Sequence, residues 1–596
     1  MTLFKKNLKN IFFFSFVLIS CYAMARAGGS GGSSDSSSDS DSGGIIAILY
    51  AIFRFIPFPY NIIVIVVVGV GYWYISKNVK SKSVLNEIPS GSSEMVDQTG
   101  ELAIFQTANP EFNPTAFKEK VKTAFVDIQS AWENQNLSKV RKWISDGVYQ
   151  RFNTQFIMMQ KLGQKNTIKN VGVKNVVIDS IETDGEFDII NTAIQFEMQD
   201  SFVCEKFPQL NEEGYYEDVE YWTFIRKKGV KEKDMYHTNN CPNCAGPLPE
   251  DGGEVSKCQH CGTTTYLGDY DWVLAEITQA ADYVNEPKRF DKSGQQTQQV
   301  RQAINAQSDF SVQLMEDKAS NGYLQIMTAF VKQKPEIMRR FVSDSLFDKL
   351  SERIKSEPPF VFNRLFLNNV TLMDAYAKDG KHNLVISIKR SAQRLSMKND
   401  KVELLDHSIF ATNEVLIMSR DAGAGQPKGS LYAHACPNCG GPIGDTMNLE
   451  CQFCGSAVNS TKYEWIISEL TTAHEYQNAM SGGSVKPSEL DELFDVRDYA
   501  FNNVMLIVGA DGVFANEELE YANSLAKKWN YKPDKISGMF DMAKQGQLVM
   551  RLPEDHKKAS KVYTMMEKAA MADGNISNEE KQILDEVKKR VAELQN

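Results

Sequence analysis

The chain has 596 residues, of which 42% are hydrophobic, and a formal net charge of −11 at pH 7. This length exceeds what one hydrophobic core supports and predicts roughly three or four folded units. The negative charge argues against a dedicated nucleic-acid binder, because such proteins usually neutralise phosphates with a basic surface. We therefore expect that nucleic acid is not a partner.

The first residues carry the features of a targeting segment. Lys5, Lys6 and Lys9 precede a short uncharged run, which is typical of a signal sequence over residues 1–27 with small residues at its cleavage site. Two alternatives stay open at this point. The segment could be an uncleaved anchor, or a bacterial lipobox that ends at Cys21.

A tether and a second apolar segment follow. Residues 28–44 contain only Gly, Ser and Asp and predict a flexible linker. Residues 45–76 form the predicted transmembrane region, because Phe55–Ser76 has no formal charge and is long enough to span a bilayer. The lysines after it mark the cytoplasmic side. We expect a single-pass protein of the bacterial inner membrane, with a linker at 77–110 and its folded units in the cytoplasm.

Eight of the ten cysteines form four Cys-x-x-Cys pairs. These pairs make two quartets, at 241–261 and 436–454, with the members Cys241, Cys244, Cys258, Cys261, Cys436, Cys439, Cys451 and Cys454. Four cysteines suit a tetrahedral Zn²⁺ ion and leave no open position for catalysis. Disulfides are the competing interpretation, but disulfide-dense chains are usually small and secreted. We predict two structural zinc ribbons that staple β-hairpins, and the near absence of basic side chains within them disfavours contact with phosphates.

Two long segments, 111–280 and 306–480, resemble each other and are joined by an expected linker at 281–305. Ala131-Trp132 of the first recurs as Ala329-Phe330 of the second, and Cys-Pro-Asn-Cys occurs in both. Duplication explains this better than chance. Each copy begins with helical periodicity and continues with alternating strand-like segments. This order predicts an α+β unit in which helices pack on one face of a curved antiparallel sheet.

The first copy resembles the Tim44-like domain, the carboxy-terminal domain of a mitochondrial import-motor adaptor that also occurs in bacterial proteins. The resemblance rests on the helix Ala116–Trp132, the strand Trp222–Arg226 and the strand Trp272–Leu274. It implies that each copy is a nuclear-transport-factor-two-like cone, a bent sheet wrapped by helices. A zinc ribbon between the last two strands departs from the family, so the role of an import-motor adaptor transfers poorly.

Residues 488–594 have helical periodicity and contain a shorter repeat. Ala510-Asp511-Gly512 and Ala572-Asp573-Gly574 are each followed by a hydrophobic residue and a Glu-Glu pair. This is similar to the tellurite-resistance TerB-like family, an all-helical fold with paired acidic motifs. One interpretation is helix capping by Asn516 or Asn578. The other is a shared divalent-cation site. The candidate ligands of that site are Asp511, Glu518, Asp573 and Glu580.

No nucleophile–base motif, phosphate loop or metal-hydrolase signature occurs in the sequence. Glu186, Asp188 and Glu197 lie in or beside predicted strands, and we expect them on a solvated face. We predict a membrane-anchored, non-enzymatic binding or scaffold protein linked to protein transport or membrane stress response, with no catalytic residues. Its cone domains would bind a protein partner or a small apolar ligand. The alternative is a small-molecule enzyme that uses a cone-domain pocket.

Overall fold

The computed structural model describes most of residues 97–594 together with a two-residue strand pair, β1 (Ala25–Arg26) and β2 (Gly29–Ser30). Its longest gaps after residue 97 are 280–299, 477–495 and 530–538. The rest of the predicted signal sequence, and the predicted transmembrane region, lie outside the described residues. None of the helices within the described ranges combines the length and the hydropathy that a membrane span requires.

The first unit is a four-stranded antiparallel sheet in the order β3-β4-β5-β6, packed against helices. Its strands are β3 (Gln164–Asp184), β4 (Phe187–Cys204), β5 (Glu212–Lys227) and β6 (Val273–Gln279). Its helices are α4 (Thr99–Ala108), α5 (Pro114–Glu133), η2 (Arg141–Trp143), α6 (Asp146–Leu162) and η3 (Pro208–Leu210). Helix α4 replaces part of the linker expected at 77–110, because its Phe105 is buried in the core of this unit.

Local sequence explains where the two main helices of this unit begin. Asn113 caps α5 by accepting a hydrogen bond from the Ala116 N–H at 3.1 Å, and proline occupies the first helical position. The apolar stripe of this helix is buried, which agrees with the helical periodicity of the sequence. Residues 137–156 do not form one helix, because Ser145 takes an extended conformation and caps α6 through the Val148 N–H.

The second unit has the same order of helices and strands. Its sheet runs β11-β10-β8-β7, with the short strand β9 beside β8. The strands are β7 (Phe360–Lys378), β8 (Lys381–Lys398), β9 (Lys401–Leu404), β10 (Phe410–Asp421) and β11 (Ile466–Thr472). The helices are α8 (Val312–Lys332), η5 (Pro335–Met338) and α9 (Asp344–Ser356). The two units together give a mixed α/β structure with two antiparallel sheets.

Irregular features recur at matching places in the two sheets. The first strand of each, β3 and β7, has three shifts of register, and the first shift places a non-glycine residue at positive φ, Asn170 at 54° and Arg364 at 57°. Such bulges bend a strand and increase its twist. Each sheet also receives a parallel bridge from the segment before a helix, Ile144 with Leu274 and Val342 with Ile467.

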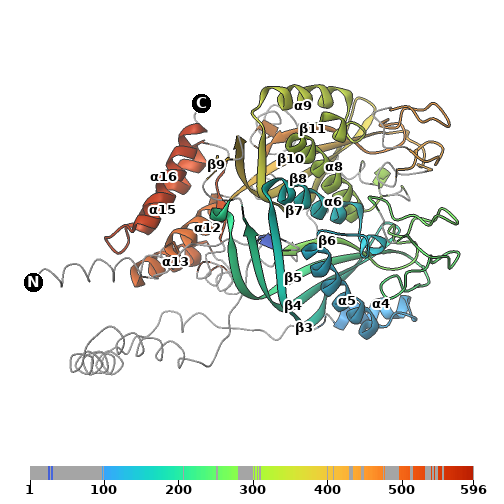
Figure 1. The fold of residues 1–596 in the computed structure, drawn as a ribbon, viewed down its shortest axis with the longest axis horizontal. Helices are drawn as coiled ribbons and strands as arrows, with labels where there is room; N and C mark the ends of the chain where they lie inside the picture. Colours follow the sequence, from blue (N-terminus) through green and yellow to red (C-terminus); the bar gives the residue numbers. More distant parts are fainter. Residues whose placement is uncertain are drawn as a thin grey trace, which may run out of the picture.

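Helices α6 and α8 pack together and join the two units (Figure 1). The hydroxyls of Thr154 and Thr328 lie 3.1 Å apart in this contact. Met158 and Leu162 of α6 belong to the hydrophobic core of the second unit rather than the first. Cys204 is also fully buried there, and its Sγ lies 3.0 Å from the Leu162 carbonyl oxygen.

The carboxy-terminal unit contains α12 (Val496–Val508), α13 (Asn516–Lys528), α15 (His556–Ala570) and α16 (Asn578–Glu593). It also supplies a strand that the helical periodicity did not predict. This strand, β12 (Met550–Arg551), pairs in parallel with the start of β10. The Asn413 side chain of β10 donates a hydrogen bond to the Tyr499 hydroxyl of α12. The helical unit is therefore attached to the second sheet.

One expectation about surface charge is wrong. Asp188 was expected on a solvated face, yet it is 4% exposed and lies 3.3 Å from the Arg226 guanidinium. The Arg226 guanidinium in turn stacks over the Trp272 ring at 4.4 Å. Glu186 is exposed and Glu197 is half-buried beside Lys174, so both lie closer to the solvated face that was expected. Burial of Asp188 is tolerated because a buried carboxylate needs a paired cation, and Arg226 provides one.

Candidate metal centres

The structure brings the eight predicted cysteines together as two separate quartets. In each quartet the four Sγ atoms lie within 4.8 Å of one another. The measured Sγ–Sγ pairs are Cys241–Cys261 at 3.6 Å, Cys244–Cys258 at 3.6 Å, Cys436–Cys454 at 3.8 Å and Cys439–Cys451 at 3.7 Å. Four thiolates about 2.3 Å from a tetrahedral Zn²⁺ ion would be roughly 3.8 Å apart. A disulfide would need about 2.05 Å. The donor set therefore fits a metal ion such as zinc.

The turns that carry the cysteines need residues with positive φ. Gly262 and Gly455 follow the second knuckle of each hairpin at φ 74° and 68°. Gly440 follows the first knuckle of the second hairpin at φ 76°. The first hairpin has Ala245 at the matching place with φ 60°, which is a strained conformation for a residue with a Cβ.

Hydroxyl and amide groups surround one cysteine of each quartet in the same way. The Asn243 side chain donates to the Thr263 hydroxyl at 3.1 Å and approaches Cys261 Sγ at 3.8 Å. Hydrogen bonding from Thr263 lowers the pKa of the Cys261 thiol to about 6. Hydrogen bonding from Ser456 lowers the pKa of the Cys454 thiol to about 6 in the second hairpin. Thiolates are the form that binds metal. Within the same quartets, neighbouring cysteines raise the pKa of Cys244, and burial raises that of Cys436, each to about 12, so the lowered pKa is confined to one cysteine of each quartet.

The first cysteine hairpin also contacts the second unit, which the sequence did not predict. Glu254 lies between the two knuckles, and its carboxylate is 3.6 Å from Arg340 and 3.3 Å from His434. It also accepts a hydrogen bond from Gln325 of α8 at 3.1 Å. His434 stands two residues before Cys436, so Glu254 connects the two hairpins. No local pattern in the sequence pointed to this contact.

A buried polar cluster lies beside these contacts, at the start of α6. Arg141 and Asp146 form an ion pair, and the Arg141 guanidinium stacks over the Tyr266 ring at 3.5 Å. Asp317 of α8 accepts hydrogen bonds from the Ser145 hydroxyl and from the Gly147 N–H. Burial raises the pKa of Asp146 to about 7 and that of Asp317 to about 6.

One feature of both units could have been found from the sequence. Lys120 of α5 pairs with Asp271 at 2.7 Å, and Lys318 of α8 pairs with Glu464 at 2.7 Å. Both lysines interrupt an apolar helix at matching positions of the two copies, and both acids precede a tryptophan. A repeated charge on an otherwise buried helix face is the signal for a buried ion pair.

The acidic motifs of the carboxy-terminal unit place two glutamates side by side. Glu518 and Glu580 are 4% and 3% exposed, and each accepts a hydrogen bond from the backbone N–H three residues earlier. Burial, and then repulsion from Glu580, raises the pKa of Glu518 to about 8. The capping interpretation is therefore right about the glutamates. It is wrong about Asn516 and Asn578, because Ala515 and Ser577 stand at the capping positions of α13 and α16.

The four predicted ligands of a divalent cation are only partly described. Asp511 lies outside the described residues, and Asp573 accepts a hydrogen bond from the Asn575 N–H at 2.9 Å. Within the part of the chain that the structure describes, groups of three or more metal-binding side chains occur only as the two cysteine quartets. The divalent-cation site therefore stays a prediction.

Comparison with known proteins identifies one region of the chain. Residues 99–237 match the family model of the Tim44-like domain. The match begins with α4, ends four residues before Cys241, and includes the first three strands of the first sheet. A comparison with curated proteins finds no match.

Proposed function

We propose that this chain is a membrane-anchored, non-enzymatic scaffold protein that binds a partner in or beside protein transport. The observation that carries this proposal is the Tim44-like match over residues 99–237. Anchoring is supported by the uncharged stretch Phe55–Ser76 and by the lysines that follow it. By this topology the folded units face the cytoplasm of a bacterial cell, where cysteines stay reduced.

In this proposal each cysteine quartet holds one structural Zn²⁺ ion. Four thiolates fill a tetrahedral zinc site, so the ion would supply folding free energy and no open coordination position. The Sγ distances support zinc over disulfides. The first hairpin would also fix the junction of the two units through Glu254.

The second unit is proposed to be a duplicate of the first, a second Tim44-like cone with its own inserted zinc ribbon. Three kinds of observation support this: matching register shifts in β3 and β7, matching parallel bridges, and matching buried lysine–carboxylate pairs. Each cysteine hairpin leaves its sheet between two neighbouring strands, β5 and β6 or β10 and β11.

The carboxy-terminal helices are proposed to be a TerB-like unit. A divalent cation would lie between the two acidic motifs, with Glu518 and Glu580 as its central ligands. The Oε1 atom of Glu580 is buried without a hydrogen-bond partner among the described residues, which supports this placement. Calorimetric titration with calcium tests it. Binding heat that disappears in Glu580→Gln is expected, and no heat at millimolar calcium would remove the metal from the proposal.

The scaffold function is tested by site-specific photo-crosslinking of the full chain in native membranes. Suitable positions for the crosslinking residue are Tyr215 on the first unit and Phe453 on the second hairpin, which are 56% and 60% exposed. We expect one protein of the transport machinery to be recovered from the anchored chain. The matched control lacks residues 45–76 and should lose that product. Recovery of no protein, together with turnover of a small molecule, would instead favour the enzyme alternative.

A further inference from the structure

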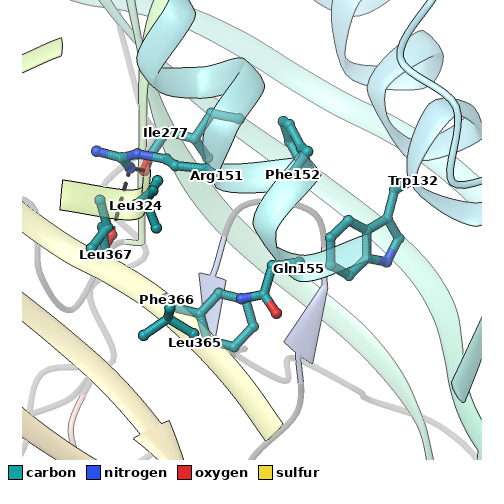
Figure 2. Close-up of a pocket in the computed structure, with 9 residues that line it drawn as sticks. All are labelled: Trp132, Arg151, Phe152, Gln155, Ile277, Leu324, Leu365, Phe366 and Leu367. Carbon is teal, nitrogen blue, oxygen red and sulfur yellow. Dashed lines mark hydrogen bonds between the residues drawn. The ribbon is translucent and has the colours of Figure 1, made fainter. Parts of the chain in front are cut away.

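A cavity of about 400 Å³, measured with the space at its mouth, lies at the seam between the two units (Figure 2). Trp132 and Phe152 line it from the first unit, and Leu365 and Phe366 line it from the second. Small-molecule sites are mostly apolar with a few polar groups that fix the orientation of the ligand. The cavity has the apolar lining of such a site.

The polar group of this cavity is Gln155 of α6. Its side chain is 5% exposed, and its Nε2 atom has no hydrogen-bond partner among the described residues. Figure 2 shows its amide between the Trp132 indole and the Phe366 ring. A buried donor without an acceptor costs about 1–3 kcal/mol. A ligand that offers an acceptor oxygen at this place removes that cost.

The charge of the cavity wall indicates which kind of acceptor fits. Arg151 also lines the cavity, and its two terminal guanidinium nitrogens are engaged, whereas its Nε is buried without a hydrogen-bond partner among the described residues. It donates to the Ile277 carbonyl at 3.0 Å, and it lies 3.6 Å from the Glu276 carboxylate. Because Glu276 balances this cation, the site offers no excess positive charge to an anion. An uncharged oxygen such as a carbonyl is the matching acceptor.

We propose that the seam cavity binds a small uncharged molecule with a compact apolar body and one carbonyl oxygen, which accepts a hydrogen bond from Gln155. This site goes beyond the scaffold proposal, because it is lined by both units and needs no protein partner. The lining residues come from α5, α6 and β6 on one side and from α8 and β7 on the other. A bound molecule therefore also stabilises the packing of the two units.

Two probes of nearly equal shape test the hydrogen bond. Cyclohexanone carries the carbonyl oxygen, and methylenecyclohexane carries a CH₂ group in its place. Binding of each to the full chain in lipid nanodiscs is measured by saturation-transfer NMR. The Leu365→Trp variant, which fills the cavity, gives the background from lipid. We expect cyclohexanone to bind the wild type about tenfold more tightly than methylenecyclohexane, the effect of one hydrogen bond.

Two variants of helix α6 complete the test. Gln155→Leu removes the unpaired amide, so it should fold at least as stably as the wild type and lose the tenfold preference for the ketone. Gln160→Leu changes an exposed glutamine of the same helix and should keep that preference. The proposal is overturned if the wild type does not distinguish the probes, if Gln155→Leu still prefers the ketone, or if neither probe binds at millimolar concentration. It is also overturned if Gln155→Leu is clearly less stable, because ordered water would then satisfy the amide.

Discussion

The same arginine–aspartate pair occurs in both units with opposite surroundings. Arg141 and Asp146 stand at the start of α6, and Arg339 and Asp344 stand at the start of α9 with the same spacing. The side chains of the first pair are 0% and 10% exposed, whereas those of the second are 20% and 80% exposed. One sequence pattern thus gives one local contact, and the neighbouring elements decide whether that contact is buried.

Two neighbours cover the first pair. The cysteine hairpin of the first unit contributes the Glu254 carbonyl, which accepts from Arg141 Nε at 2.6 Å. Helix α8 contributes Asp317, which approaches the backbone of Gly147 so closely that a Cβ at this position would clash with it. The first unit therefore depends on its hairpin and on the second unit for the environment of its ion pair. The helix α9 of the second unit keeps its charged face in solvent.

Removing a zinc ligand from either hairpin should change the stability of the protein more than any other substitution considered for these two units. Cys244→Ser and Cys439→Ser each remove one thiolate, and each should lower the zinc content from two ions per chain to one. Structural zinc contributes on the order of 10 kcal/mol to small zinc domains. Cys244→Ser should lower the melting temperature more than Cys439→Ser, because the first hairpin covers the Arg141–Asp146 pair, whereas the matching Arg339–Asp344 pair is exposed. Metal analysis and thermal unfolding check this.

Equal falls in melting temperature for the two variants would contradict that explanation. It would mean that the Arg141–Asp146 pair stays covered without the first hairpin. Zinc content well under two ions in the wild type would be more serious, because it would reject the metal itself. The serine variants keep the size of the side chain nearly unchanged, so packing contributes little to the difference.

The second largest effect should come from the ion pairs themselves. Arg141→Met leaves Asp146 buried without its cation, and breaking a buried pair in this way costs about 3–5 kcal/mol. Arg339→Met breaks the exposed counterpart, for which about 0–1 kcal/mol is expected. Urea denaturation of both variants measures the contrast. A cost of Arg339→Met similar to that of Arg141→Met would show that burial of the pair is not what matters.

Sequence patterns predicted the features that depend on nearby residues. The helical periodicity at the start of the first copy and the spacing of the cysteines are both local, and the structure has the helix and the two quartets where they were expected. The break before α6 has a local and a long-range cause. Ser145 caps the helix through the Val148 N–H. The Ser145 N–H also donates to the Leu274 carbonyl of β6 at 2.9 Å, and nothing near Ser145 in the sequence encodes that partner, so the sequence did not predict it.

Buried charges were missed for the same reason. In the first unit, Phe125, Phe196 and Trp222 fill the space between α5 and the sheet. In the second, Tyr323 of α8 donates to Glu414 of β10, which also pairs with Arg390 of β8 at 2.9 Å. These three polar residues come from a helix and two strands. Each taken alone looks like an exposed residue, so only the fold reveals that they satisfy one another.

The smallest of the expected effects is a pH dependence of stability. Burial raises the pKa of Asp146 to about 7 and that of Asp317 to about 6, whereas both carboxyls ionise near pH 4 in the unfolded chain. Between these values the folded state holds more protons than the unfolded state. The contribution of these two carboxyls to the free energy of unfolding is therefore fully present below about pH 4 and is lost as the pH rises to about 7.

Asparagine substitutions assign this pH dependence to the buried pair. Asp146→Asn stays neutral at every pH, so the slope of unfolding free energy against pH should become less negative by up to about 1.4 kcal/mol per pH unit. Asp344→Asn is the matched control, because its side chain is 80% exposed and its slope should equal that of the wild type. Urea midpoints between about pH 5.5 and 7.5, with zinc present throughout, give the slopes. Identical slopes of unfolding free energy against pH for both variants would mean that Asp146 ionises as freely as the exposed Asp344. The two ion pairs would then differ in packing and not in ionisation.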